Sequence, residues 1–311
     1  MHNNVLRIAT RKSPLALWQA QFVGDQIKQY WPELTIELVP MLTSGDRFLK
    51  DKLQAIGGKG LFVKELEEAM LAGRADIAVH SMKDVPAQLP DGLQLAATCR
   101  RDNPFDALIS IKYDSLESLP VNSVIGTTSL RRQSQLLAYR PDLVIKPLRG
   151  NIQTRLAKLE SEEFDAIILA AAGLERMALD QHIRQILDDR LMLPACGQGA
   201  LSIECRSNDA VIQQILQPLN DRVTAACVNA ERLVNGLLGG NCHVPLAVYC
   251  SPEQEQQIRL RARVLALDGC IVIEDTQNGK LAEANELAQQ CADNLLAKGA
   301  AELLSNDHGQ D

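Results

Sequence analysis

The sequence repeats one local pattern about five times: an apolar, strand-like run ends in a turn that carries arginine or lysine, and a helix then begins. The clearest example is the segment 123–132, which opens a helical stretch that extends to Tyr139. Short apolar strands that alternate with helices are typical of βαβ units around a mostly parallel sheet. The pattern therefore predicts an α/β protein with doubly wound sheets.

This example places Arg131 and Arg132 in the first turn of its helix. Cations at that position oppose the helix dipole and destabilise the helix by about 0.3–1 kcal/mol each. An anion bound by the backbone N–H groups and the guanidinium groups would compensate this effect. For this segment alone, a solvated pair of arginines explains the sequence equally well.

The recurrence of cations after strand-like runs favours a bound ligand over solvated pairs. In open α/β sheets, ligands bind just outside the carboxyl ends of the strands. Cations at several such ends therefore predict one cationic crevice. The other turns carry Arg11 and Lys12 after 5–9, Lys83 after 76–80, Arg149 after 143–145 with Arg155 one helical turn later, and Arg176 after 165–170.

The composition limits the class of protein. With 311 residues, of which 46% are hydrophobic and 23% charged, the chain can form two or three globular domains. Its net charge of −7 argues against a nucleic-acid-binding protein, and cations focused in one crevice of an acidic molecule indicate a discrete anionic ligand. Neither a signal peptide nor an apolar run of membrane-spanning length is recognisable, so we expect a soluble, cytoplasmic protein that does not contact a membrane.

The eight cysteines include no Cys-x-x-Cys pair, and the five histidines show no metal-ligand spacing with them. A chain of this size without a secretion signal is expected to keep its thiols free. We therefore expect no disulfide framework and no metal site.

Turn-forming residues divide the chain into three parts. An α/β pattern, with helices at 14–30 and 61–72, extends to Cys99, and a second α/β set occupies about 107–193. The Gly- and Pro-rich segment 193–200 is predicted to be a crossover. From Asn220 onward, a helix, three short strands and a closing helix that ends at Gly299 predict a small α+β domain.

Two acidic residues lie close to the basic turns. Asp84 follows Lys83, and a carboxylate in a cationic cleft can stabilise a positively charged intermediate and move a proton. A surface ion pair or a carboxylate at a helix start explains Asp84 equally well. Asp46 could assist it, although ordinary turn chemistry also accounts for the segment 43–46.

Cys242 lies in a loop that differs from the surroundings of the other seven cysteines. Two glycines, an asparagine and a nearby proline predict an exposed and sharply turned segment, 239–245. A thiol displayed there is available for covalent chemistry, whereas the other cysteines need only a place in the core. His243 is a weak candidate for its base, because adjacent residues seldom have the geometry of a nucleophile and base.

The glycine-rich segment 56–62 does not form a nucleotide-binding motif. It lacks the spacing of the Walker A loop and the Ser or Thr that would follow Lys59. We interpret it as a mobile segment over the crevice, with Lys59 directed inward. The absence of a G-x-G-x-x-G motif after a strand argues against nicotinamide binding.

Taken together, these motifs closely resemble those of the porphobilinogen deaminase family, also called the hydroxymethylbilane synthase family. The resemblance extends essentially from end to end, and this combination of motifs is highly specific. The segments that show the resemblance are Ala9–Ala16, Gly57–Phe62, His80–Pro86, Ser129–Arg132, Leu148–Asn151, Pro194–Ala200 and the Cys242 loop.

The resemblance implies a fold of two domains like those of type II periplasmic binding proteins, plus a small α+β third domain. Domain 1 is expected to be discontinuous and to comprise 1–99 and 200–217. Domain 2 is expected at 100–199, including the crossover segments. Domain 3, at 218–311, is expected to carry the cofactor-anchoring cysteine loop.

The resemblance also implies the reaction. Four porphobilinogen molecules are joined head to tail with loss of ammonia, and the product is then hydrolysed to hydroxymethylbilane. The primer is one dipyrromethane cofactor per chain, bound through a cysteine thioether. Each pyrrole ring carries an acetate and a propionate, so the growing chain accumulates carboxylates that suit a cationic crevice. Porphobilinogen is the expected small-molecule partner, and a monomer is the expected state.

The family's functional residues map onto positions of this sequence. Cys242 would anchor the primer, and Asp84 would contact the pyrrole N–H groups and stabilise the cation left when ammonia departs. The resemblance assigns primer binding also to Ser13, Asp46, Lys83, Asp84, Ser129, Arg131 and Arg132, substrate binding to Arg11, Gln19, Arg149, Arg155 and Arg176, and a lid to Lys59 and Phe62.

One departure from the family pattern occurs beside the anchoring cysteine. The family's usual run is Leu-Glu-Gly-Gly-Cys, whereas this chain has Leu-Gly-Gly-Asn-Cys at 238–242. Asparagine tolerates a left-handed backbone better than most residues other than glycine, so we expect the turn to be kept.

Two other functions fit parts of the sequence. A non-catalytic carboxylate-binding module can use the same fold, but it predicts no covalent adduct and no release of ammonia. An enzyme that acts on phosphates or nucleotides would also need cations, but the missing Walker A and Rossmann spacings argue against it.

Overall fold

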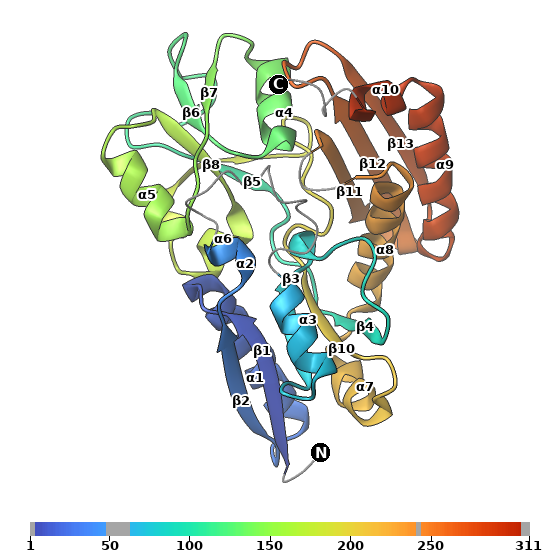
Figure 1. Cartoon of the computed structure of the whole chain (residues 1–311). Coiled ribbons are helices and arrows are strands. Elements are labelled where there is room, and N and C mark those ends of the chain that lie inside the picture. Colours follow the sequence, from blue (N-terminus) through green and yellow to red (C-terminus); the bar gives the residue numbers. More distant parts are fainter. Residues whose placement is uncertain (1–3, 48–62, 241–243, 306–311) are drawn as a thin grey trace. The chain divides into compact units, whose positions relative to one another are not determined.

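The computed structural model describes residues 4–47, 63–240 and 244–305. The chain forms two compact units (Figure 1). Unit 1 comprises 1–102 and 200–225, and unit 2 comprises 103–199 and 226–311.

Unit 1 is built on a five-stranded sheet with the strand order β2-β1-β3-β10-β4. β1 runs parallel to β2 and β3, whereas β10 runs antiparallel to β3 and β4. β10, which lies between β3 and β4, belongs to the segment 200–225 and therefore follows residues 103–199 of unit 2 in the sequence. The strands are β1 Val5–Arg11, β2 Thr35–Met41, β3 Ile77–Ser81, β4 Leu93–Thr98 and β10 Leu201–Arg206.

Helices cover both faces of this sheet. Residues Ile8 and Ile77 pack on one face with α1, whereas Ala9 and Ala78 pack on the other with α3. Successive residues of a strand point to opposite faces of the sheet, so each strand packs against helices on both faces. The helical segments are α1 Pro14–Tyr30, α2 Ser44–Arg47, α3 Lys64–Leu71, η3 Met82–Asp84, α7 Ala210–Leu216 and η5 Gln217–Leu219.

Unit 2 contains a second five-stranded sheet, with the order β7-β6-β8-β5-β9. β6 is parallel to β7 and β8, and β5 is antiparallel to β8 and β9. The strands are β5 Asp106–Ile109, β6 Val124–Gly126, β7 Val144–Lys146, β8 Ala166–Ala170 and β9 Ile183–Leu187. The helical segments are α4 Leu130–Tyr139, α5 Ile152–Glu160, α6 Ala171–Arg176 and η4 Asp180–His182.

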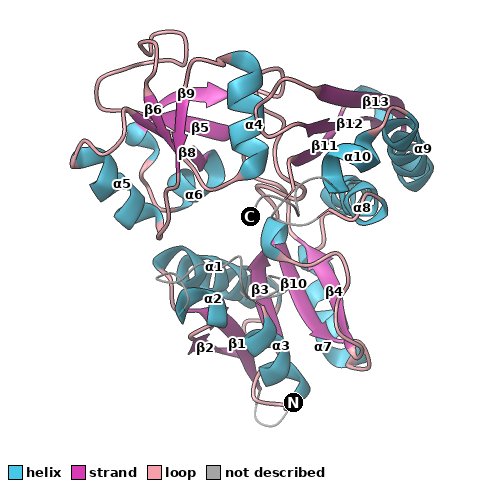
Figure 2. Cartoon of the chain, turned by 45° about the horizontal axis from the view of Figure 1, so that its top comes forward, coloured by secondary structure: helices cyan, strands magenta, loops and turns pink. Residues whose placement is uncertain are grey.

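The C-terminal part of unit 2 is an antiparallel three-stranded sheet packed against helices (Figure 2). The turn that contains Asp268 and Gly269 joins β12 to β13, and Gly269 adopts a positive φ of 75°, which glycine tolerates. The segments are α8 Arg222–Leu237, β11 Leu246–Pro252, η6 Gln254–Gln256, β12 Gln257–Leu265, β13 Val272–Lys280, η7 Leu281–Glu283, α9 Ala284–Ala297 and α10 Ala300–Ser305.

The expected fold class is confirmed. Each five-stranded sheet contains three parallel strands next to an antiparallel one, which is the arrangement of type II periplasmic binding proteins. The predicted helix 14–30 has the predicted bounds, because Ser13 caps its start and Pro14 occupies the first position. The last strand, β13, extends to Lys280, and each of its residues is paired with one of β12.

Within the described ranges, every helix is too short or too polar to cross a membrane.

Candidate active site

The five basic turns of the sequence lie at the carboxyl ends of strands in two sheets. The turns at Arg11 and Lys83 follow β1 and β3 of unit 1. Those at 129–132, Arg149 and Arg176 follow β6, β7 and β8 of unit 2 or lie one helix later. Because these strands are parallel within each sheet, each group of turns lies along a single sheet edge.

The edge of the unit 1 sheet contains a pocket of about 60 Å³. It lies where β1 and β3 end and where α1 and α3 begin, as the rule for α/β sheets predicts. Its lining brings together four predicted site residues: Arg11, Ser13 and Gln19 from one stretch of the chain, and Asp84 from a distant one. Leu15, Ala16, Val63, Val79, His80 and Ser81 complete it.

Hydrogen bonds fix the side chains of this pocket. Gln19, which is 3% exposed, donates from Nε2 to Oγ of Ser81 at 2.9 Å. The Ser13 hydroxyl accepts from the backbone N–H of Ala16 at 3.3 Å and so caps α1. A polar wall with fixed donors and acceptors can recognise a ligand without first having to be ordered.

Asp84 ends the short helix η3, which follows β3 directly. The N–H of Met82, at the start of η3, donates to the carbonyl of Ala200 at 3.0 Å, and the N–H of Val85 donates to the carbonyl of Met82 at 3.1 Å. The turn is therefore held on β10 as well as on its own strand, and Asp84 is presented at the pocket from a rigid element.

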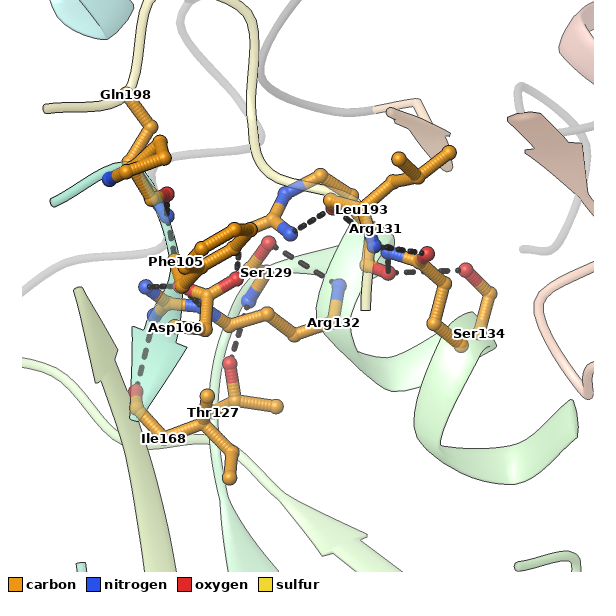
Figure 3. A network of polar contacts seen from close by, with 12 residues as sticks. Phe105, Asp106, Thr127, Ser129, Arg131, Arg132, Ser134, Ile168, Leu193 and Gln198 are labelled. Atoms are coloured by element: carbon orange, nitrogen blue, oxygen red, sulfur yellow. Dashed lines mark hydrogen bonds and ion pairs between the residues drawn. The ribbon is translucent and has the colours of Figure 1, made fainter. Parts of the chain in front are cut away.

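The edge of the unit 2 sheet contains a different arrangement, a buried pair of arginines around one carboxylate (Figure 3). Asp106, which is fully buried, lies 2.8 Å from Nη2 of Arg131 and 2.7 Å from Nη2 of Arg132. Nε of Arg132 also donates to Asp106, at 3.0 Å. Both guanidinium groups are more than nine-tenths buried.

Backbone carbonyls take up further donors of this pair. Nη1 of Arg131 donates to the carbonyl of Leu193 at 2.7 Å, and Nη1 of Arg132 donates to that of Ile168 at 3.0 Å. Gln135 fixes the Leu193 peptide by accepting from its N–H at 2.9 Å and donating to its carbonyl at 3.1 Å. The arginines are thus held in place by the fold itself.

The sequence analysis missed Asp106, because it sought acids only within the basic turns. β5 is antiparallel to β8, and this pairing sets Asp106 opposite Ala170 at the carboxyl end of β8. A signal was present: an aspartate starts an otherwise apolar strand, and such a carboxylate requires a buried partner. The identity of that partner depended on strand direction.

Two further predicted site residues of unit 2, Arg155 and Arg176, lie in α5 and α6 and donate to loop carbonyls. Arg155 donates from Nε to the carbonyl of Gly150 at 2.8 Å, and Arg176 donates from Nη2 to that of Gly199 at 2.7 Å. Gly150 has a φ of 119°, and a Cβ on it would lie 2.7 Å from Cγ2 of Thr154. The turn after Arg149 therefore requires glycine.

Several predicted site residues lie outside the described part of the chain. These are Lys59, Phe62 and Cys242, together with the side chain of Asp46, whose backbone belongs to α2.

The fold and these two sites define an α/β protein that gathers cationic and acidic side chains at the carboxyl ends of its strands. Residues 6–214 match the family described as "Porphobilinogen deaminase, dipyromethane cofactor binding domain", and residues 225–297 match "Porphobilinogen deaminase, C-terminal domain". The chain belongs to the porphobilinogen deaminase family, as the resemblance indicated. It is a transferase that uses a dipyrromethane cofactor.

Curated relatives cover the whole chain. Porphobilinogen deaminases of Legionella pneumophila strains Paris, Philadelphia 1 and Lens are each 63% identical to it over 305 residues, which is 98% of this chain and 99% of each relative.

Solved structures of lower similarity share parts of the architecture. A putative methionine-binding lipoprotein from Bacillus subtilis has a TM-score of 0.44 at 13% identity and covers 70% of this chain and 91% of its own. The methionine-binding protein MetQ has a TM-score of 0.45 at 15% identity, and the match covers 69% of this chain and 89% of MetQ. These weak similarities add nothing to the assignment.

The buried arginine pair fits a cofactor that carries carboxylates. Two guanidinium groups and one carboxylate leave a net charge of +1 in a nearly water-free site at a helix N-terminus. Burial lowers the pKa of Arg131, the nearby charge of Arg132 lowers it further, and Asp106 opposes both. One additional carboxylate would neutralise the site, and the acetate and propionate groups of dipyrromethane supply such carboxylates.

Proposed function

We propose that the chain joins four porphobilinogen molecules head to tail on a covalently bound dipyrromethane, with loss of ammonia at each addition, and then hydrolyses the product to hydroxymethylbilane. The observation that carries this proposal is 63% identity with curated porphobilinogen deaminases over 98% of the chain. The dipyrromethane supplies the primer from which the product is built.

We propose Asp84 as the catalytic residue. A carboxylate on a rigid turn, in a pocket shared with Arg11, can stabilise the cation left on the substrate when ammonia departs. It can also accept a hydrogen bond from a pyrrole N–H. The pocket's arginine would bind a substrate carboxylate at the same time and so orient the ring.

The cations divide between two tasks in this proposal. Arg131 and Arg132, with Ser129, hold carboxylates of the primer, and the buried excess charge described above supports this role. Ser13, Asp46 and Lys83 complete the primer site. Arg11, Gln19, Arg149, Arg155 and Arg176 bind incoming substrate and the lengthening product, and Lys59 and Phe62 form a lid.

We further propose that Cys242 carries the primer, despite the unusual Asn241 beside it. Cys242 follows the end of α8, at Leu237, by five positions in the sequence. The domain division into 1–99 with 200–217, 100–199 and 218–311, the cytoplasmic location and the monomeric state are also retained as proposals.

Intact-protein mass spectrometry tests the anchor. The wild-type chain should carry a two-pyrrole adduct, and porphobilinogen should add a ladder of heavier species. Cys242→Ala should lose both. Cys270→Ala is the control, because Cys270 is an exposed thiol and its loss should have no effect on the adduct.

A two-pyrrole adduct on Cys242→Ala would refute the anchor. A wild-type chain without an adduct that binds porphobilinogen but releases no ammonia would instead indicate the carboxylate-binding module. A titration in which phosphate binds more tightly than porphobilinogen would favour the phosphate-handling enzyme.

A further inference from the structure

One face of the unit 1 sheet buries polar side chains beneath helix α3. β3 and β10 are antiparallel and pair Ala78 with Glu204 and His80 with Ser202. Paired and alternate residues point to the same face, so His80, Ser202 and Glu204 share it with Ala78. Ala78 packs with the apolar residues of α3, and this identifies the covered face.

His80 and Glu204 form a buried contact across the two strands. Nε2 of His80 lies 2.9 Å from Oε2 of Glu204, and neither residue is more than 5% exposed. His80 also lines the pocket that contains Asp84, and it precedes that residue by four positions on the same strand and turn. The contact therefore extends from the pocket wall into the interior of unit 1.

Glu67 of α3 adds a second buried carboxyl group to this face. It is 7% exposed, and its pKa is raised to about 7, chiefly by desolvation; the charges of Glu204 and Glu68 contribute to the rise, and that of His80 opposes it. At neutral pH this group is therefore partly protonated. The charges of His80 and Glu204 thus act on the Glu67 carboxyl group.

Three buried oxygens in this region are not satisfied by other side chains or backbone groups of the described residues. They are Oε1 of Glu67, Oε1 of Glu204 and Oγ of Ser202. Buried carboxylate oxygens normally have a hydrogen-bond partner. In the described part of the chain, no three His, Cys, Asp or Glu side chains are grouped so that they could hold a metal ion. A proton on a carboxyl group is the simplest way to satisfy such oxygens.

The other charged groups near Glu67 are exposed, form hydrogen bonds or ion pairs, or lie at the ends of this face. On α3 itself, Glu68 is largely exposed and Glu65 accepts hydrogen bonds from Ser44. Asp76 directly precedes β3, at the end of the strand away from the pocket. It forms ion pairs with Arg7 of β1 at 2.9 Å and with Arg206 of β10 at 3.4 Å. Arg11 ends β1 at the pocket.

We propose that Glu67, His80 and Glu204 form a buried proton-holding cluster that sets the charge behind the Asp84 pocket. The cluster is a positioning device and does not touch the substrate. When it loses a proton to solvent, it adds one negative charge behind the pocket and so stabilises the cation that forms on the substrate. This inference rests on the proposed role of Asp84.

The pH dependence of kcat, measured on holoenzyme that carries its adduct, tests the cluster. For the wild type we expect kcat to rise about five- to ten-fold between pH 6 and pH 8.5 with a midpoint near 7, the effect of one charge on a pocket wall at an effective dielectric of about 20. Glu67→Gln should abolish this step, because glutamine does not ionise. Glu68→Gln, on the exposed side of the same helix, should retain the step, with its midpoint moved slightly to lower pH because the charge of Glu68 also raises the pKa of Glu67.

Two further variants separate a charge effect from a structural one. Glu204→Gln removes a charge that raises the pKa of Glu67, so the midpoint should move to lower pH. His80→Gln removes a charge that lowers it, so the midpoint should move to higher pH. General damage to the fold would not move the midpoint in opposite directions.

If kcat of Glu67→Gln still rose with pH with an unchanged midpoint, the proposed cluster would be refuted. Loss of the rise in Glu68→Gln would also refute it. A wild type without a step near pH 7 would do the same. If Glu67→Gln does not fold, opposite shifts in the other two variants support the cluster, and equal or absent shifts refute it. Release of no ammonia by the wild type at any pH would refute the proposed function instead.

Discussion

The two sheet edges combine the same types of side chain in opposite ways. In unit 1, Asp84 and Arg11 line an open pocket. In unit 2, Arg131 and Arg132 are buried around Asp106. In the proposed function, the first arrangement leaves a carboxylate available to a transient cation, and the second holds cations in a fixed geometry for a carboxylate of the primer. The comparison indicates that a basic strand end can serve either chemistry or attachment, depending on where its acid lies.

The strongest test of the unit 2 arrangement is Asp106→Asn. This change leaves two buried guanidinium groups without their carboxylate, and we expect it to lower the free energy of unfolding by about 3–5 kcal/mol. Glu162→Gln is the control, because its ion pair with Lys112 is more than half exposed on both sides and is worth at most about 1 kcal/mol. Urea denaturation of both variants measures the difference. Equal effects would show that Asp106 is no more than a surface-like partner.

The corresponding test in unit 1 is Asp84→Ala. Loss of an electrostatic stabiliser lowers kcat by about 10²–10³-fold or more, whereas the free energy of unfolding should hardly change. Asp91→Ala, in an exposed turn of the same unit, should retain full activity. Rates of ammonia release and thermal denaturation separate the two effects. If Asp84→Ala lowered the free energy of unfolding as much as Asp106→Asn, the proposed difference between a catalytic carboxylate and a structural one would be contradicted.

The smallest expected effects concern the two serines that cap the helices at these edges. Ser13 accepts from the N–H of Ala16 at 3.3 Å, and Ser129 accepts from that of Arg132 at 3.4 Å. Alanine at either position should lower the free energy of unfolding by about 1 kcal/mol. Aspartate should restore the cap but place a negative charge where an anion is to bind, so Ser129→Asp should reduce the adduct seen by mass spectrometry. Normal adduct in Ser129→Asp would argue against primer binding there.

The sequence predicted those parts of the sites that depend on local chemistry. The helix at 14–30, whose start Ser13 and Pro14 set, and the strand-turn-helix repeats depend on neighbours in the chain. The pairing of Asp106 with Arg132 depends on the direction of β5, and that of His80 with Glu204 joins residues 124 positions apart. No local pattern specifies such contacts, because they follow from strand order and register.

The family resemblance supplied what periodicity could not, including the function and the cofactor, both of which agree with the family match. The roles of the individual site residues remain predictions. His80 illustrates the limit: it lies within a recognised motif, yet only the paired strand β10 reveals its carboxylate partner.

The position of β10 between β3 and β4 has a consequence for biosynthesis. The ribosome must translate the entire first sheet of unit 2 before residues 201–206 emerge and can enter the older sheet. Until then a nascent chain exposes the hydrogen-bonding edges of β3 and β4, which are natural targets for chaperones or for mispairing. Of the two five-stranded sheets, the one that is begun first is therefore the one that is completed last.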